Sequence, residues 1–143
     1  MITIVNGGTQ GLGEAVARTL VAGGARGLVL SGRSANRGAA LADELTAAGT
    51  RTEFVRCDIT DTDAPSTIVE RCEEVFGTVN GVVNVAALTT RSTVFSDTPE
   101  HFDAMIAANT RAPYFLIQAA VRLMVRQGST GSIVNVGSTS GHG

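Results

Sequence analysis

Short apolar runs alternate along this chain with longer segments of helical periodicity, and this alternation constrains the fold most strongly. The apolar runs, rich in β-branched residues, are 2–5, 27–31, 52–56, 81–85 and 132–136. The helical segments between them are 11–22, 35–48, 66–76 and 98–123. Strands joined by helical crossovers run parallel, and their helices cover both faces of the sheet. The pattern therefore predicts an α/β fold, with an open, doubly wound sheet of five parallel strands.

Two segments carry further local signals. Residues 52–56 alternate between polar and apolar side chains, which predicts an edge strand exposed on one side. Pro113 removes a backbone donor inside the last helical segment, so we expect a kink there. No linker, composition shift or fixed-period repeat divides the 143 residues. We therefore expect a single domain over residues 1–143.

Composition narrows the classes of function. The net charge is -2 and the eleven basic residues are scattered singly, which argues against a nucleic-acid or polybasic membrane surface. No apolar run approaches the ~20 residues that cross a bilayer, and the N-terminus lacks a basic signal-peptide region. We therefore expect a cytoplasmic protein. Cys57 and Cys72 lack metal-ligand spacing, so we interpret them as reduced thiols rather than as a disulfide or a zinc site, and predict no metal site.

A glycine-rich turn follows the first apolar run. Its sequence is Asn6-Gly7-Gly8-Thr9-Gln10-Gly11-Leu12-Gly13. Because it follows a buried strand and opens a helix, the turn favours dinucleotide binding over a purely structural role. Gly7 would permit a tight turn, Gly11 a close approach of the backbone to a pyrophosphate, and Gly13 close packing of helix on strand. Free N–H groups at the helix start would face the anion.

The spacing Gly-x-x-x-Gly-x-Gly resembles that of the short-chain dehydrogenase/reductase family, and four further segments match this family in order. They are Cys57-Asp58-Ile59-Thr60, Asn84-Val85-Ala86-Ala87, Ala107-Ala108-Asn109-Thr110 and Gly137-Ser138-Thr139-Ser140-Gly141. The resemblance covers the whole chain and implies a Rossmann-type sheet with strand order 3-2-1-4-5, cut short relative to the family. The chain departs from the family's pattern at Asn6, where the family has Thr, and at Val85 and Ala87, where it has Asn and Gly.

The resemblance also implies a nicotinamide dinucleotide cofactor. Asp58 would contact the adenine amino group, and the segment after the fourth strand would line the cofactor. The residues expected to bind it are Gly7, Thr9, Gln10, Gly11, Leu12, Gly13, Arg33, Asp58, Ile59, Asn84, Ala86 and Ala87.

The end of the second strand bears on which nicotinamide cofactor binds. An NAD-selective site needs a carboxylate there, whereas this chain has Gly32, followed by Arg33 and, one turn onward, Arg37. A small residue leaves room for a 2′-phosphate, and a guanidinium can bind that group bidentately. The pattern favours NADP(H), with NAD(H) as the alternative. The competing interpretation of Arg33 is a solvated loop charge.

The chemistry implied by the resemblance is hydride transfer between the nicotinamide and a small carbonyl or alcohol substrate. Ser138 would hydrogen-bond the substrate oxygen, and Asn109 would hold its helix open at a bulge and fix a water for a proton relay. The competing interpretations are a strand-end serine that satisfies backbone groups and an asparagine bonded to a neighbouring loop. The family's acid/base is a tyrosine assisted by a lysine four residues later.

The chain contains no lysine, and its one tyrosine is Tyr114, inside the last helical segment. His101 and His142 are expected to be surface residues. We therefore expect these 143 residues to be inactive alone, and interpret them as the N-terminal part of an NADP(H)-dependent carbonyl reductase that forms homo-oligomers when complete. The alternatives are a complete, non-catalytic dinucleotide-binding module and a different Rossmann enzyme, such as a methyltransferase.

Overall fold

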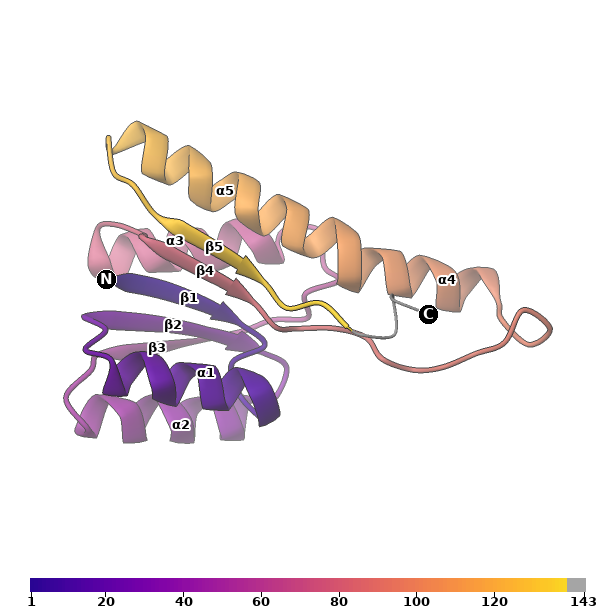
Figure 1. The fold of residues 1–143 in the computed structure, drawn as a ribbon, viewed down its shortest axis with the longest axis horizontal. Coiled ribbons are helices and arrows are strands. Elements are labelled where there is room, and N and C mark those ends of the chain that lie inside the picture. Colours follow the sequence, from indigo (N-terminus) through magenta and orange to yellow (C-terminus); the bar gives the residue numbers. More distant parts are fainter. Residues whose placement is uncertain (139–143) are drawn as a thin grey trace.

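The computed structural model describes residues 1–138, which form one twisted parallel sheet between two layers of helices (Figure 1). The strands are β1 (Ile2–Asn6), β2 (Gly27–Gly32), β3 (Thr52–Arg56), β4 (Gly81–Asn84) and β5 (Ser132–Asn135). They pair in parallel in the order β3-β2-β1-β4-β5. The fold class and strand order are thus confirmed, and β3 lies at an edge as its alternation predicted.

The helices follow the expected segments closely. They are α1 (Gly11–Ala22), α2 (Ala35–Ala47), α3 (Ala64–Phe76), α4 (Pro99–Ile106), the π-helical segment η1 (Ala107–Arg111) and α5 (Ala112–Arg126). Local signals set their ends: α3 has Pro65 in its first turn and stops at Gly77, which has a φ of +71°. Figure 1 shows α1 and α2 on one face of the sheet, and α3 and α5 on the other.

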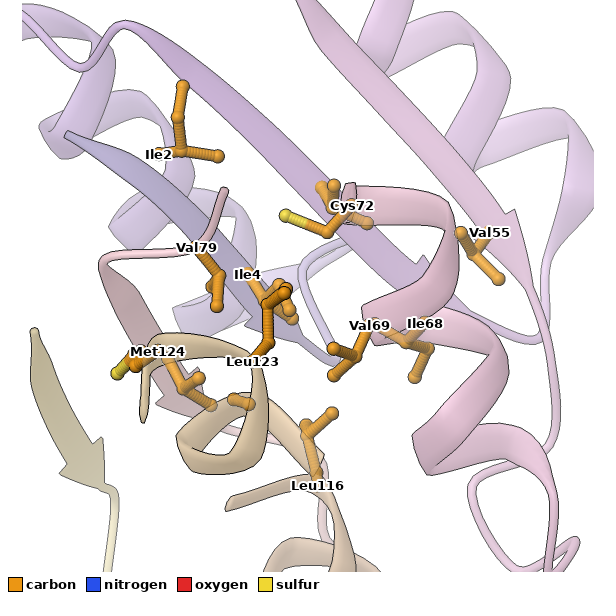
Figure 2. Close-up of a cluster of buried hydrophobic side chains, with 13 residues drawn as sticks. Ile2, Ile4, Val55, Ile68, Val69, Cys72, Val79, Leu116, Leu123 and Met124 are labelled. Carbon is orange, nitrogen blue, oxygen red and sulfur yellow. The ribbon is translucent and has the colours of Figure 1, made fainter. Parts of the chain in front are cut away.

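Alternation along the strands divides the core into two clusters. Ile2 and Ile4 of β1 face α3 and α5, where they join Ile68 and Leu116 in the cluster of Figure 2. Val5 points to the opposite face and belongs to a second cluster under α1 and α2. Full burial of one such aliphatic side chain contributes about 1.5–3 kcal/mol. The sheet is therefore held from both sides, which fixes the positions of its strand ends.

The last helical segment differs from its expected form. The irregularity lies before Pro113, in the five π-helical residues of η1, and α5 continues regularly from Ala112. In an α-helix the N–H of residue 113 would bond to the carbonyl of Asn109, and a proline has no N–H to donate. The wider turn ahead of Pro113 accommodates this loss. The irregularity expected from Pro113 is thus present, in the turn that precedes the proline.

Both cysteines are free thiols in the structure. Cys72 is buried in the core, and this desolvation raises its pKa to about 12, so the thiol stays neutral. Within residues 1–138 no helix is long and apolar enough to cross a bilayer. The same residues hold no group of three or more His, Cys, Asp or Glu side chains placed to bind a metal ion.

Candidate functional site

The sequence-predicted residues gather at the edge of the sheet where the strands end. Parallel strands all finish at their carboxyl ends on the same side, and in this class of sheet ligands bind just outside that edge. The glycine loop follows β1, Arg33 follows β2, Asp58 follows β3, and the segment from Val85 follows β4. The topology thus brings together groups that are far apart in the sequence.

The glycine loop is packed tightly against two neighbouring strands. Gly7 has a φ of +81°, and a Cβ there would lie 2.6 Å from the backbone nitrogen of Ala86. The N–H groups of Gly7 and Gly8 both donate to the carbonyl of Ser31, at 3.1 and 3.2 Å. Gly11 has a φ of +53°, and its Cβ direction points into open space. The loop is held on its inner side and leaves its outer side open.

Gly13 has a different contact from the one expected. A Cβ at this position would lie 2.0 Å from the carbonyl oxygen of Gly7, inside the loop itself. The glycine therefore lets the first turn of α1 close onto the loop, whereas we expected it to let the helix close onto a strand.

The first turn of α1 has the features of an anion site. Its N-cap residue, Gln10, makes no side-chain capping bond. The first N–H groups of a helix have no partner within the helix, and the helix dipole adds partial positive charge at this end. Glu14, the acidic residue in this turn, is paired with Arg18 at 2.9 Å. The turn can therefore accept a phosphate from the open side of the loop.

A row of polar side chains crosses the sheet directly below this loop. Ser31 Oγ donates to Asn6 Oδ1 at 3.0 Å, and Asn6 Nδ2 donates to Asn84 Oδ1 at 3.3 Å. Asn84 Nδ2 then donates to Asn135 Oδ1 at 2.8 Å. These residues are register partners on β2, β1, β4 and β5. The row ties the four strand ends together through side chains, in addition to the backbone ladder.

Sequence reasoning missed this row as a unit. Each member is a polar residue near the end of an apolar run, but a chain read alone does not show which residues become partners across the sheet. Asn6 also holds the next loop, since its carbonyl accepts the N–H groups of Val85 and Ala86, both at 2.9 Å. The Asn6 backbone thus holds the loop after β4, and the Asn6 side chain bonds Ser31 and Asn84 on the two neighbouring strands.

The end of β2 leaves little room beside Gly32. A Cβ on Gly32 would lie 2.9 Å from Thr9 Oγ1, so any larger residue at position 32, a carboxylate included, would displace Thr9. The next residue, Arg33, is exposed, and so is Arg37. The charge of Arg33 acts on Asp58 across the ends of β2 and β3. A guanidinium and a carboxylate thus lie near one another at the ends of β2 and β3.

Asp58 sits in a compact turn. Its Oδ1 accepts from Thr60 N at 2.9 Å and from Thr60 Oγ1 at 2.8 Å, and its carbonyl accepts from Asp61 N at 3.1 Å. These bonds from Thr60, and to a lesser degree the charge of Arg33, hold the pKa of Asp58 below its ordinary value. The side chain is therefore a carboxylate at neutral pH and can accept from an amino group. Ile59 follows it as a partly buried apolar neighbour.

Asn109 lies in the middle of η1 and bonds to the loop after β4. Its Oδ1 accepts from Leu88 N at 2.8 Å, and its Nδ2 donates to Leu88 O at 2.9 Å. The asparagine thus lies in a bulged helical turn and is also bonded to a neighbouring loop, while its role in fixing a water stays a prediction. The site thus gains a fixed connection between η1 and the segment that contains Ala86 and Ala87.

Other predicted residues lie at the margin of this edge. Ser138 is exposed just after β5, and residues 139–143, His142 among them, lie outside the described part of the chain. Tyr114 is exposed, and its ring packs edge-on against Phe115. His101 differs from its expectation as a plain surface residue: its ring bonds Asp97 at 2.5 Å and Thr90 at 2.9 Å. It therefore braces the loop between β4 and α4.

Comparison with known proteins places this geometry in a family. The short chain dehydrogenase family model matches residues 1–143. A 3beta-hydroxysteroid dehydrogenase of Mediterraneibacter gnavus is 36% identical over 141 residues, which cover 98% of this chain and 50% of that protein. The chain spans about half the length of the curated relatives it matches.

Solved structures agree with this comparison. A 3-ketoacyl-ACP reductase from Sinorhizobium meliloti superposes with a TM-score of 0.91 at 26% identity, over 99% of this chain and 55% of that one. A blue fluorescent protein from a metagenomic library, in complex with NADPH, gives a TM-score of 0.86 at 32% identity, over 96% of this chain and 55% of that one. The chain described here belongs to the short-chain dehydrogenase/reductase family.

Proposed function

We propose that this chain forms the cofactor-binding part of an NADP(H)-dependent oxidoreductase that acts on a small carbonyl or alcohol. The observation that carries this proposal is the meeting of the glycine loop, the Gly32-Arg33 corner and Asp58 at one edge of the sheet. Bound NADP(H) would supply the hydride or accept it. The chain's own residues would bind and orient the cofactor.

The pyrophosphate would lie against the outer side of the glycine loop. The open space beyond Gly11 lets a ligand approach the backbone, and the uncapped start of α1 offers N–H donors there. The exposed Gln10 and Leu12 would complete this surface, and Thr9, which is buried beside Gly32, would support it. Side chains at Gly7 or Gly13 would fill space that the loop itself occupies, so these two glycines would act by shaping the cradle.

The 2′-phosphate of NADP(H) would be recognised beside Gly32. No carboxylate fits at this position without displacing Thr9, so the usual partner of an NAD ribose is missing. Arg33 supplies a charge with the geometry to bind phosphate bidentately. The relative solved with NADPH bound supports this choice of cofactor. NAD(H) is the alternative cofactor, and binding measurements distinguish it from NADP(H).

The adenine and nicotinamide ends would occupy separate loops. Asp58 would accept from the adenine amino group, with Ile59 beside the ring, because the Asp58 side chain is held as a carboxylate by Thr60. Asn84, Ala86 and Ala87 would line the path towards the nicotinamide, since the glycine loop touches Ala86.

Ser138 and Asn109 would serve the reaction itself. Ser138 would hydrogen-bond the substrate oxygen, and Asn109 would position the loop after β4 and a water for proton transfer. The tyrosine and lysine that act as acid/base in the family are not supplied here, because the chain has no lysine. We therefore expect these residues alone to bind cofactor without turnover. The second candidate function is a non-catalytic dinucleotide-binding module.

The remaining features of the proposal concern the protein as a whole. Residues 1–143 would act as one nucleotide-binding domain, located in the cytoplasm. The complete protein would be a homo-oligomer, and its ligands would be small molecules rather than nucleic acids or membranes.

Calorimetric titration of the purified chain tests the proposal. We expect NADPH to bind and S-adenosylmethionine to give no heat. Binding of the methyl donor without NADPH would overturn it in favour of a methyltransferase-type site. For the longest open reading frame that contains this chain, consumption of NADPH in the presence of a carbonyl supports the enzyme. Binding without consumption of NADPH across a carbonyl panel favours the non-catalytic module.

A further inference from the structure

Arg111 connects the bulged helical turn to the loop that carries Asp58. Its Nη2 donates to the carbonyl of Thr60, across 51 positions in the sequence. Arg111 is the last residue of η1, two positions after Asn109. The π-turn therefore carries two polar side chains that bond to two different loops at the carboxyl edge, Asn109 to Leu88 and Arg111 to Thr60.

Thr60 is the residue through which this connection would reach the adenine site. While its carbonyl accepts from Arg111, its N–H and its hydroxyl both donate to Asp58 Oδ1. The Thr60 carbonyl shares its peptide plane with the N–H of Asp61, which donates to the Asp58 carbonyl at 3.1 Å, so the orientations of these two groups are not independent. Fixing the Thr60 carbonyl therefore restricts the turn that orients the Asp58 carboxylate.

A pocket beside Arg111 leaves the turn after β3 with less packing support on this side. A pocket of about 190 Å³ lies between the turn and the helices, lined in part by Ile59, Asp61, Pro65, Arg111 and Phe115. The turn is thus backed by a hollow on this side rather than by closely packed side chains. A hydrogen bond from a charged donor is among the stronger polar contacts.

We propose that Arg111 is a positioning residue for adenine binding, which acts by holding the Thr60 carbonyl and thereby the orientation of Asp58. This inference rests on the proposed function, because it assigns Asp58 to the adenine. Arg111 does not act on Asp58 through its charge, since the charge that lowers the pKa of Asp58 is that of Arg33. The geometry of the turn is the quantity that Arg111 controls.

The test measures the dissociation constant of adenosine 2′,5′-bisphosphate, a probe that carries the adenine and the 2′-phosphate but no nicotinamide. In Arg111→Met we expect this constant to rise by about tenfold, the effect of one lost charge-assisted hydrogen bond. Arg111→Lys keeps a charged donor and should recover most of the affinity. Arg122→Met removes an exposed arginine from α5 and serves as the matched control, with affinity unchanged.

A double-mutant cycle separates positioning from a general loss of structure. If Arg111 acts through Asp58, Arg111→Met should have little further effect in an Asp58→Ala background. Equal effects in both backgrounds, or a tenfold loss in Arg122→Met as well, would overturn the inference. Failure of the unmodified chain to bind the probe would instead count against the proposed cofactor site. If Arg111→Met does not fold, Arg111→Lys and Arg111→Gln carry the same comparison.

Discussion

The side chain of Asn109 is bonded to both backbone groups of Leu88, with its Oδ1 2.8 Å from the N–H nitrogen and its Nδ2 2.9 Å from the carbonyl oxygen. An amide side chain matches a peptide group in this way, with one donor and one acceptor side by side. The π-turn η1 presents Asn109 to the loop after β4, so the irregular helix and the loop fix one another.

Removing this amide should loosen the loop after β4. In Asn109→Ala we expect faster hydrogen exchange at the Leu88 N–H and a free energy of unfolding lower by about 1 kcal/mol, because two solvent-exposed hydrogen bonds are lost. The control is Thr110→Ala, which changes the neighbouring exposed residue. Unaltered exchange at Leu88 in Asn109→Ala would show that the loop is held by other contacts.

The polar row below the glycine loop should be more sensitive at its centre than at its end. Asn84→Ala leaves the Asn6 amide buried without its acceptor and also removes the bond to Asn135, so we expect a loss of about 1–3 kcal/mol in the free energy of unfolding. Asn135→Ala removes one hydrogen bond at an exposed strand and should lower the free energy of unfolding by less. Chemical denaturation measures both, and equal losses would contradict a row centred on Asn84.

Substitutions of Gly11 and Gly13 should have harmful effects for different physical reasons. Gly13→Ala places a Cβ 2.0 Å from a backbone oxygen, so we expect loss of stability at or above ~3 kcal/mol. Gly11→Ala meets open space and carries only the strain of its positive φ, about 1–2 kcal/mol, but should abolish NADPH binding. Gly137→Ala, which also meets open space, is the control. Thermal melts and NADPH titration separate the effects; a stable Gly13→Ala would contradict the loop geometry.

Titration of Asp58 tests the compact turn after β3. Because its pKa is lowered by folding, Asp58 contributes stability above the ordinary aspartate value of about 3.9, and this contribution is lost as pH falls through the lowered value. Thr60→Val removes one of the two bonds to the carboxylate and should raise the pKa of Asp58 part of the way back. Carboxyl NMR measures the shift. Thr62→Val, whose hydroxyl bonds Asp63 instead, should leave the pKa of Asp58 unchanged.

Much of the fold follows from local patterns in the sequence. The buried, β-branched character of β1 and the glycine stops after α1 and α3 determine where elements begin and end, and alternation in β3 identified an edge strand. The glycine loop could be located because it follows an apolar run directly, whereas Asp58 was identified through the resemblance of its segment to the family. These signals lie within a few residues of the feature that they predict.

The parts that sequence reasoning missed depend on contacts between distant segments. The row from Ser31 to Asn135 exists only once the strand register is set, and the link from Arg111 to Thr60 joins two different crossovers. Pro113 signalled an irregular helix correctly, but the wider turn forms ahead of it, where Asn109 finds Leu88 as a partner. The resemblance to the family, rather than local propensity, placed a bulge at Asn109, but the partner of its amide could not be read from the sequence.

The choice between NADP(H) and NAD(H) is measured most directly with Arg33. Parallel calorimetric titrations of NADPH and NADH should show tighter binding of NADPH to the unmodified chain, because the guanidinium beside Gly32 would pair with the 2′-phosphate under the proposed assignment. Arg33→Gln should lower the affinity for NADPH by about tenfold or more and leave the affinity for NADH nearly unchanged. The control variant Arg26→Gln, just before the amino end of the same strand, should alter neither affinity. Equal losses for both dinucleotides in Arg33→Gln, or tighter binding of NADH by the unmodified chain, would contradict the assignment.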